Sequence, residues 1–147
     1  MTRILLVLIG LLFAGIAAAQ SGPPASQAVL SYTALKAVSE TYSSPAITSG
    51  TLTIDLSAGT VFNVTNNADI TTFTIANAAS GQASAFTLFL KGDGTTPGHA
   101  QTWPTNVKWP SGLAPTLTTT NGKVDVLTFV SNDGGTTWFG FVAGQNY

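Results

Sequence analysis

The sequence predicts an all-β protein, an antiparallel β-sandwich of the jelly-roll-like kind, and three observations lead to this fold class. Apolar and polar residues alternate with a period of two in several segments after residue 47, as they do in half-buried strands. Expected strands and turns follow one another about every ten residues, which is typical of sandwiches and jelly rolls. Only 7% of the residues are charged, so Thr, Ser and Asn supply the polar faces, and Thr suits strands.

The first three strands are expected at residues 51–56, 61–64 and 70–76, with turns of small and amide residues between them. In the first of these strands the alternation places Leu52 and Ile54 on one face. This face would pack into the sandwich core.

The middle of the domain holds one long strand and two short ones. Residues 85–91 are apolar at nearly every position, which predicts a strand buried on both faces. Residues 102–103 and 107–109 predict short strands interrupted by proline, which suits the edge or rim of a sheet.

A hairpin is expected at the C-terminus. Residues 123–130 form a strand pattern with Asp125, Leu127 and Phe129 on one face, and an Asp-Gly-Gly turn follows. In the returning strand Trp138 and Gly140 share a face, and a neighbouring ring is expected to cover the glycine. Four aromatic residues are expected in the core or in a contact between subunits. They are Phe129, Trp138, Phe139 and Phe141.

The N-terminal residues 1–19 have the three parts of a secretory signal. Arg3 precedes an apolar run from Ile4 to Ile16, and three alanines offer a cleavage site before Gln20. The alternative is an uncleaved membrane anchor, in which the alanines extend an apolar helix. The mature protein is therefore expected to be exported, and any membrane contact is expected to come from residues 1–19.

Residues 20–46 read as a linker that contains one possible short helix. Pro23 and Pro24 interrupt regular structure at its start. Residues 28–42 carry apolar and aromatic side chains at spacings of three and four, which predicts an amphipathic helix, with a loosely held strand or loop as the alternative. Residues 47–147 form the predicted β-sandwich domain.

The composition excludes several classes of function. The net charge is −1 and the five basic residues form no cluster, so nucleic acid is not an expected partner. The absence of cysteine excludes disulfides and thiolate chemistry. His99 is the only histidine, and no serine or cysteine motif lies near it to form a catalytic arrangement. The sequence therefore predicts a protein that is not an enzyme and that needs no cofactor.

The loops near residues 93–112 hold the candidate contact residues for a glycan or receptor. Trp103 and Trp109 could form a platform on which a sugar stacks, with Asp93 and His99 nearby; the alternative is that both rings pack over the sheet edge. Calcium binding by Asp93 or Asp133 is less favoured than a turn-forming role, because neither loop holds a second carboxylate. No metal site is therefore expected.

The order of several motifs resembles a small β domain found at the C-terminus of bacteriophage tail-fibre and other virion proteins. The motifs are Trp103-Pro104, Val107-Lys108-Trp109-Pro110, residues 114–119, residues 124–129 and residues 133–140, and the resemblance covers about residues 47–147. It implies a non-enzymatic part of the virion surface, often trimeric. The partners it implies are copies of the same chain, other virion proteins and a cell-surface glycan.

Two functions are therefore expected from the sequence. The first is a phage structural protein of the fibre, spike or decoration type, which acts in assembly and in attachment to the host surface. The alternative is a secreted carbohydrate-binding module or adhesin, which the signal and the paired tryptophans favour. The expected location is the virion surface in the first case and the extracellular space in the second.

Overall fold

A computed structural model describes residues 39–147, which belong to one compact unit of the chain. The predicted signal or anchor at residues 1–19 lies outside the described residues, as does the linker up to residue 38. Of the helix predicted at residues 28–42, only the last four residues are described. Ser39 to Thr41 belong to no regular element, and Tyr42 begins a strand. None of the helices in the described part is long and apolar enough to cross a membrane.

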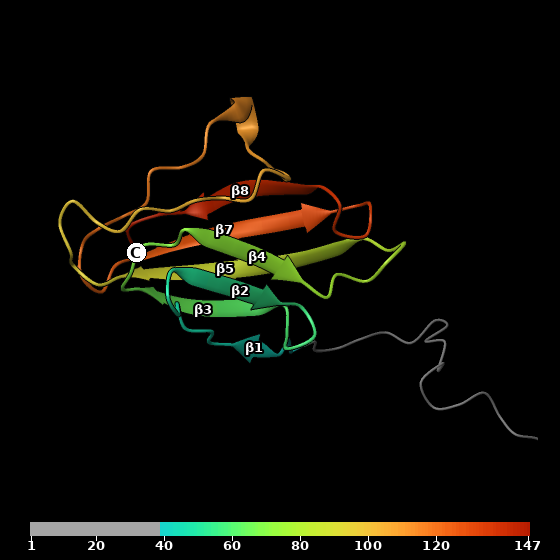
Figure 1. Ribbon diagram of the computed structural model, residues 1–147, viewed down its shortest axis with the longest axis horizontal. Coiled ribbons are helices and arrows are strands. Elements are labelled where there is room, and N and C mark those ends of the chain that lie inside the picture. Colours follow the sequence, from blue (N-terminus) through green and yellow to red (C-terminus); the bar gives the residue numbers. More distant parts are fainter. Residues whose placement is uncertain (1–38) are drawn as a thin grey trace, which may run out of the picture. The chain divides into compact units, whose positions relative to one another are not determined.

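The described chain is all-β, and its strands form two sheets that pack together (Figure 1). The strands are β1 (Tyr42–Ser43), β2 (Thr51–Asp55), β3 (Val61–Asn66), β4 (Thr72–Ala76), β5 (Ser84–Gly92), β6 (Val107–Lys108), β7 (Val124–Ser131) and β8 (Trp138–Gly144). A 3-10 turn, η2 (Pro110–Gly112), follows β6. The larger sheet has the order β1-β3-β5-β7-β8-β6, and β2 and β4 form the smaller sheet. The predicted all-β class and the packed layers are confirmed.

The predicted antiparallel, jelly-roll-like arrangement is wrong for the first half of the domain. Four pairings are parallel, namely β1–β3, β2–β4, β3–β5 and β6–β8, and only β5–β7 and β7–β8 are antiparallel. From β1 to β5 the chain crosses to the other sheet after every strand, so β3, β4 and β5 each pair in parallel with the strand two places earlier in the chain. Alternation with a period of two shows that a segment is half-buried, and it contains no information on the direction of its neighbour.

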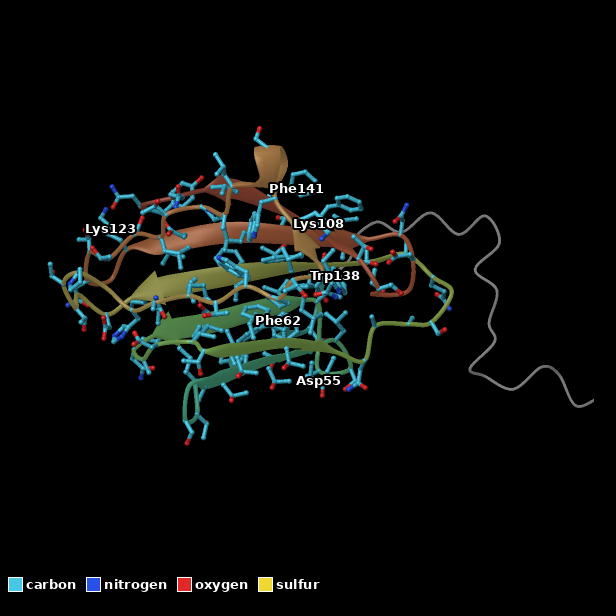
Figure 2. The ribbon with its side chains drawn as sticks, turned by 45° about the horizontal axis from the view of Figure 1, so that its top comes forward. Asp55, Phe62, Lys108, Lys123, Trp138 and Phe141 are labelled. Atoms are coloured by element: carbon cyan, nitrogen blue, oxygen red, sulfur yellow. The ribbon has the colours of Figure 1, made fainter. Side chains whose placement is uncertain are left out.

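The core lies between the smaller sheet and the inner face of the larger sheet. Leu52, Ile54 and Phe73 from the smaller sheet meet the alternate, inward-facing residues of the larger sheet. Those inward residues are Phe62, Val64, Phe86, Leu88, Leu90, Leu127, Phe129 and Trp138. Figure 2 shows Phe62 and Trp138 inside the molecule.

Two strand predictions need correction. The expected double burial of residues 85–91 is wrong, because β5 buries Phe86, Leu88 and Leu90 and leaves Phe89 half-exposed on the other face. Residues 102–103 form no strand, although Gln101 makes an isolated bridge to Ile70. In the described part, β2 and β4 form the only other sheet, and they cover the inner face of the larger sheet. No second sheet therefore covers the outer side of β5 in this part of the chain.

Candidate functional site

The structure gathers most of the predicted contact residues around one polar cavity of about 270 Å³. The loop of residues 93–101 forms one wall and the segment 114–119 forms the other. Asp93, His99 and Trp103 all line it, together with Asn66 at the end of β3 and Gln101. Trp109 does not line this cavity, so the structure brings together three of the four residues predicted from the sequence.

Asp93 shapes the loop that forms the first wall. Its carboxylate accepts hydrogen bonds from the backbone N–H of Thr95, at 2.9 Å, and from the Thr95 hydroxyl, at 3.0 Å. This is the turn-forming role that an Asp plays two residues before the group it binds. The Thr95 N–H and then the His99 ring lower the pKa of Asp93 from its ordinary value. Asp93 is therefore held as an acceptor beside the cavity.

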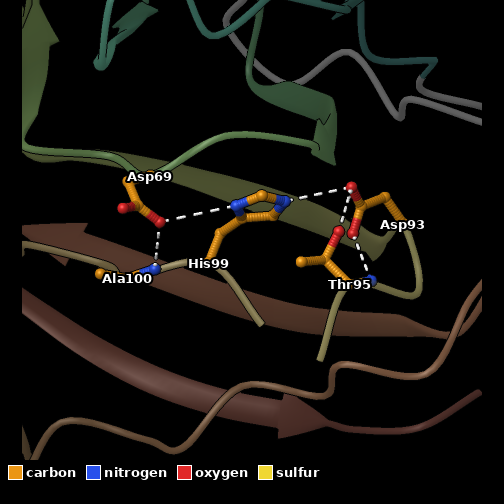
Figure 3. Close-up of polar contacts among 5 residues, drawn as sticks. All are labelled: Asp69, Asp93, Thr95, His99 and Ala100. Atoms are coloured by element: carbon orange, nitrogen blue, oxygen red, sulfur yellow. Dashed lines mark hydrogen bonds and ion pairs between the residues drawn. The ribbon is translucent and has the colours of Figure 1, made fainter. Parts of the chain in front are cut away.

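His99 lies between two carboxylates (Figure 3). Its Nε2 is 3.1 Å from Asp93 Oδ2, and its Nδ1 is 3.5 Å from Asp69 Oδ1. Asp69 also accepts a hydrogen bond from the backbone N–H of Ala100, at 2.8 Å, so this carboxylate is fixed from two sides. The His99 side chain is 17% exposed. Asp69 was not among the residues predicted from the sequence, because it lies in a turn 30 residues before His99.

The second wall is held by a buried carboxylate, Asp125 of β7, which is 1% exposed. It accepts hydrogen bonds from Thr118 N–H at 2.6 Å, from Gln145 Nε2 at 3.2 Å and from Asn146 N–H at 3.1 Å. Buried carboxylates need such partners because water is absent. Asp125 thereby joins the cavity wall to the C-terminal residues. Its position in the inward-facing row of residues 123–130 was visible in the sequence, but its partners were not.

Two buried side-chain amides at the cavity lack part of their hydrogen bonding. Asn66 is only 6% exposed, and its Oδ1 has no hydrogen-bond partner. Gln101 Oε1 is also buried and without a partner. Buried polar atoms in folded proteins are almost always paired, with protein or with ordered water. Asn66 Oδ1 and Gln101 Oε1 are therefore two acceptors beside the cavity that lack a donor from the described chain.

The two tryptophans predicted as a sugar platform do not form one flat surface. Their ring centres are 5.0 Å apart and their planes are inclined by 69°. Trp103 also contacts Phe73 and Phe129, at 5.3 and 5.8 Å between ring centres. Both rings are half-buried and pack against the core. Glycan contact through either ring stays a prediction, and Trp103 is the one that reaches the polar cavity.

Trp109 covers Gly140, as the sequence predicted for a neighbouring ring. A Cβ built on Gly140 would lie 2.7 to 2.9 Å from three carbons of the indole. Trp138, on the same face of β8, is 1% exposed and belongs to the core with Phe129. The close approach of Trp109 to bare backbone explains why β8 carries a glycine there.

The other two predicted aromatics, Phe139 and Phe141, point away from the core. They are 43% and 47% exposed on the outward side of β8, and Figure 2 shows Phe141 at the periphery. We call the outward side of the larger sheet its outer face. The strand registers pair Tyr42 with Val61, Phe89 with Val126, and Val130 with both Ala85 and Phe139, while Thr87 and Thr128 lie between Val61 and Phe141. The apolar residues of this face are exposed or half-buried. They are Tyr42, Val61, Ala85, Phe89, Val126, Val130, Phe139 and Phe141.

The outer face carries few charges and continues into an apolar hollow. Alternation places Lys91 of β5 and Lys108 of β6 on it, and Glu40, just before β1, lies beside Ala85 and Thr87. The hollow has a volume of about 320 Å³. Its lining consists of Trp109, Pro110, Leu113, Pro115, Phe141 and Val142. Phe141 belongs to both surfaces, so they are continuous.

Comparisons with protein-family models, curated proteins and solved structures gave no match for this chain. Within the described residues, no three His, Cys, Asp or Glu side chains are arranged to hold a metal ion. The geometry therefore offers two surfaces that bear on function, the polar cavity and the outer face.

Proposed function

We propose that this protein is a non-enzymatic structural component of a phage virion that works by assembling with copies of itself, as a trimer. The outer face is the single observation that carries the assembly part of the proposal. Exposed apolar side chains gathered on one face, here Tyr42, Val130, Phe139 and Phe141, favour a contact surface. The virion part is supported by the resemblance of residues 47–147 to small virion β domains. The virion surface is then the place where it acts.

The chemistry of the outer face favours a second copy of the chain as its occupant. The net charge of −1 leaves little long-range repulsion between copies. A ring of three requires two different contact surfaces on each copy, because only twofold contacts use the same surface twice. The outer face and the hollow beside Trp109 supply such a pair, and Phe141 lies where they meet.

The oligomeric state of the full chain tests assembly. Light scattering at micromolar concentration should give a mass of three chains. Replacing Phe139 and Phe141 by lysine should reduce it to the mass of one chain. The matched control carries the same two lysines at Thr72 and Thr74, which are exposed and two residues apart on β4, and should keep the mass of the unchanged protein. A single-chain mass for the unchanged protein would contradict the proposal.

The virion part needs a separate test. Mass spectrometry of purified virus particles from a culture of the source organism should detect peptides of residues 39–147. Detection only in the cell-free medium, with none in the particles, would instead support the secreted module. Peptides from residues 1–19 in either fraction would show that the signal is retained as an anchor.

A further inference from the structure

We propose that the polar cavity between residues 93–101 and 114–119 binds a neutral saccharide residue. This inference goes beyond assembly, because it assigns a ligand class to a different surface. It would hold equally for a virion protein and for a secreted one.

The unpaired amides are the first argument. Asn66 is nine-tenths buried and lines the cavity, and its Oδ1 lacks a partner, as does Oε1 of Gln101. A half-turn of the Asn66 amide exchanges its oxygen and nitrogen, so Asn66 can accept from or donate to a ligand. Gln101 Nε2 already donates to Thr102 O, at 3.5 Å, which leaves Oε1 as the acceptor of Gln101. Sugar hydroxyls both donate and accept, and they match this pair of groups. An apolar ligand would leave both amides unpaired at a cost in affinity.

The charges are the second argument, and they decide between neutral and acidic sugars. Asp93 lines the cavity, and Asp69 lies on the far side of His99. His99 already contacts both carboxylates, so it is not free to neutralise an incoming anion. The basic side chains Lys91, Lys108 and Lys123 do not line the cavity. Carboxylates accept hydrogen bonds from hydroxyls and repel phosphate or carboxylate groups.

The size and the apolar part of the lining are the third argument. A volume of about 270 Å³ is just below the usual range of ligand sites, roughly 300 to 1,000 Å³. One sugar ring suits this space, and a nucleotide or a peptide does not. Trp103, Pro97, Pro115 and Leu117 provide carbon surface beside the polar groups. A sugar has the same mixture, with hydroxyls at its rim and C–H groups on its faces.

The single histidine of the chain provides the measurement. His99 is the only histidine, so its imidazole C–H signal in a proton–carbon NMR spectrum is assigned without further work. The full chain includes the apolar run at residues 4–16, so it is titrated in a detergent whose headgroup is not a sugar. The probes are glucose, galactose, mannose and N-acetylglucosamine, with glucuronate and N-acetylneuraminate as acidic counterparts. At least one neutral sugar should shift the His99 signal to saturation in the millimolar range, and the acidic sugars should not.

Gln101→Leu keeps the size of the side chain and removes its amide. It should weaken binding of the same sugar about tenfold, which is the loss of one to two hydrogen bonds. Gln82→Leu is the matched control, because it is the same change at an exposed residue between β4 and β5 that does not line the cavity. It should leave the affinity unchanged, and thermal unfolding should show both variants folded.

Three results would overturn the proposal. They are the absence of a saturable shift with every neutral sugar, equal shifts with calcium chloride or acidic sugars, and unchanged binding by Gln101→Leu. The double variant Phe139→Lys and Phe141→Lys separates a failure of sugar binding from a failure of assembly. If it is a single chain and still binds the sugar, the two surfaces act independently; if it loses the sugar while folded, the cavity does not carry binding by itself.

Discussion

The inner face of the larger sheet is covered in two different ways, and the difference shows where the stability of the domain is concentrated. Over β3 and β5 the cover is regular, since β2 and β4 supply small aliphatic residues such as Leu52 and Ile54. Over β7 and β8 it is irregular, because Phe73 of β4 reaches Phe129, at 6.4 Å between ring centres, while Trp103 and Trp109 come from a loop. In a regular cover, the contribution to the stability of the domain is spread over many similar contacts. An irregular one depends on a few large rings and on the hydrogen bonds that hold the loop.

The largest expected effect falls on Phe129 of β7, against which the rings of the irregular cover pack. Phe129 stacks on Phe86 at 4.7 Å and contacts Trp103 and Trp109 at 5.8 and 5.6 Å between ring centres. Phe129→Ala should lower the free energy of unfolding by about 3–5 kcal/mol. Ile54→Val in the regular cover should cost about 0.5–1.5 kcal/mol. Urea unfolding followed by tryptophan fluorescence measures both. A loss of stability for Phe129→Ala no larger than that for Ile54→Val would show that the rings around Phe129 contribute little to the stability of the domain.

The sequence predicted the hairpin of β7 and β8 better than it predicted the loop that covers this hairpin. The alternation at residues 123–130 identified Asp125, Leu127 and Phe129 as one face, and all three are buried. Gly140 indicated a covering ring because a missing side chain leaves a specific space. These features are local in the sequence, and local periodicity is what such patterns contain.

The features that the sequence did not predict depend on contacts between distant segments. The parallel pairing of β3 with β5 follows from the crossing between sheets, which no local pattern encodes. The cavity joins Asn66, His99 and Thr118 from three separate segments. The sequence placed Asp125 on one face with Leu127 and Phe129, but its partners Gln145 and Asn146 lie 20 and 21 residues away.

Asp125 offers the next test, because it holds the irregular cover to the sheet. Asp125→Asn keeps the shape but turns an amide N–H₂ toward one of the three donors around it. The expected loss in the free energy of unfolding is about 1.5–3 kcal/mol. Amide hydrogen exchange should accelerate at Thr118 and Asn146 more than in β2 and β4. Uniform acceleration through both sheets would show that Asp125 supports the whole domain rather than one cover.

Gly140→Ala should produce a loss of about 1–3 kcal/mol in the free energy of unfolding. The added methyl group would meet the Trp109 ring below 3.0 Å, so the ring must move away from β8. Combining it with Trp109→Leu makes a double-mutant cycle, in which the second change should remove most of the cost of the first. Additive losses would mean that Trp109 does not oppose the methyl group.

The smallest effect concerns the hairpin turn, where Asp133 responds to acid. Its carboxylate accepts from Thr137 N–H at 2.9 Å and from the Ser131 hydroxyl at 2.8 Å. These bonds, the Thr137 N–H first, lower the pKa of Asp133 from its ordinary 3.8. The unfolded chain therefore binds a proton at higher pH than the folded protein does, so the contribution to stability is present above pH 3.8 and is lost as the pH falls through the lower, folded value.

Asp133→Asn should accordingly flatten part of the fall in the thermal midpoint below about pH 4. Asn132→Ala, in the same turn, changes no charge and should keep the pH dependence of the unchanged protein. The midpoints are measured by circular dichroism in steps between about pH 2 and pH 6, where the carboxylates titrate. Part of the fall should remain in Asp133→Asn, because Ser57 and Asn77 lower the pKa of Asp55 and Thr95 and His99 lower that of Asp93. A full fall with Asp133→Asn would place the acid sensitivity at those two residues, in the parallel half and at the cavity, rather than in the hairpin.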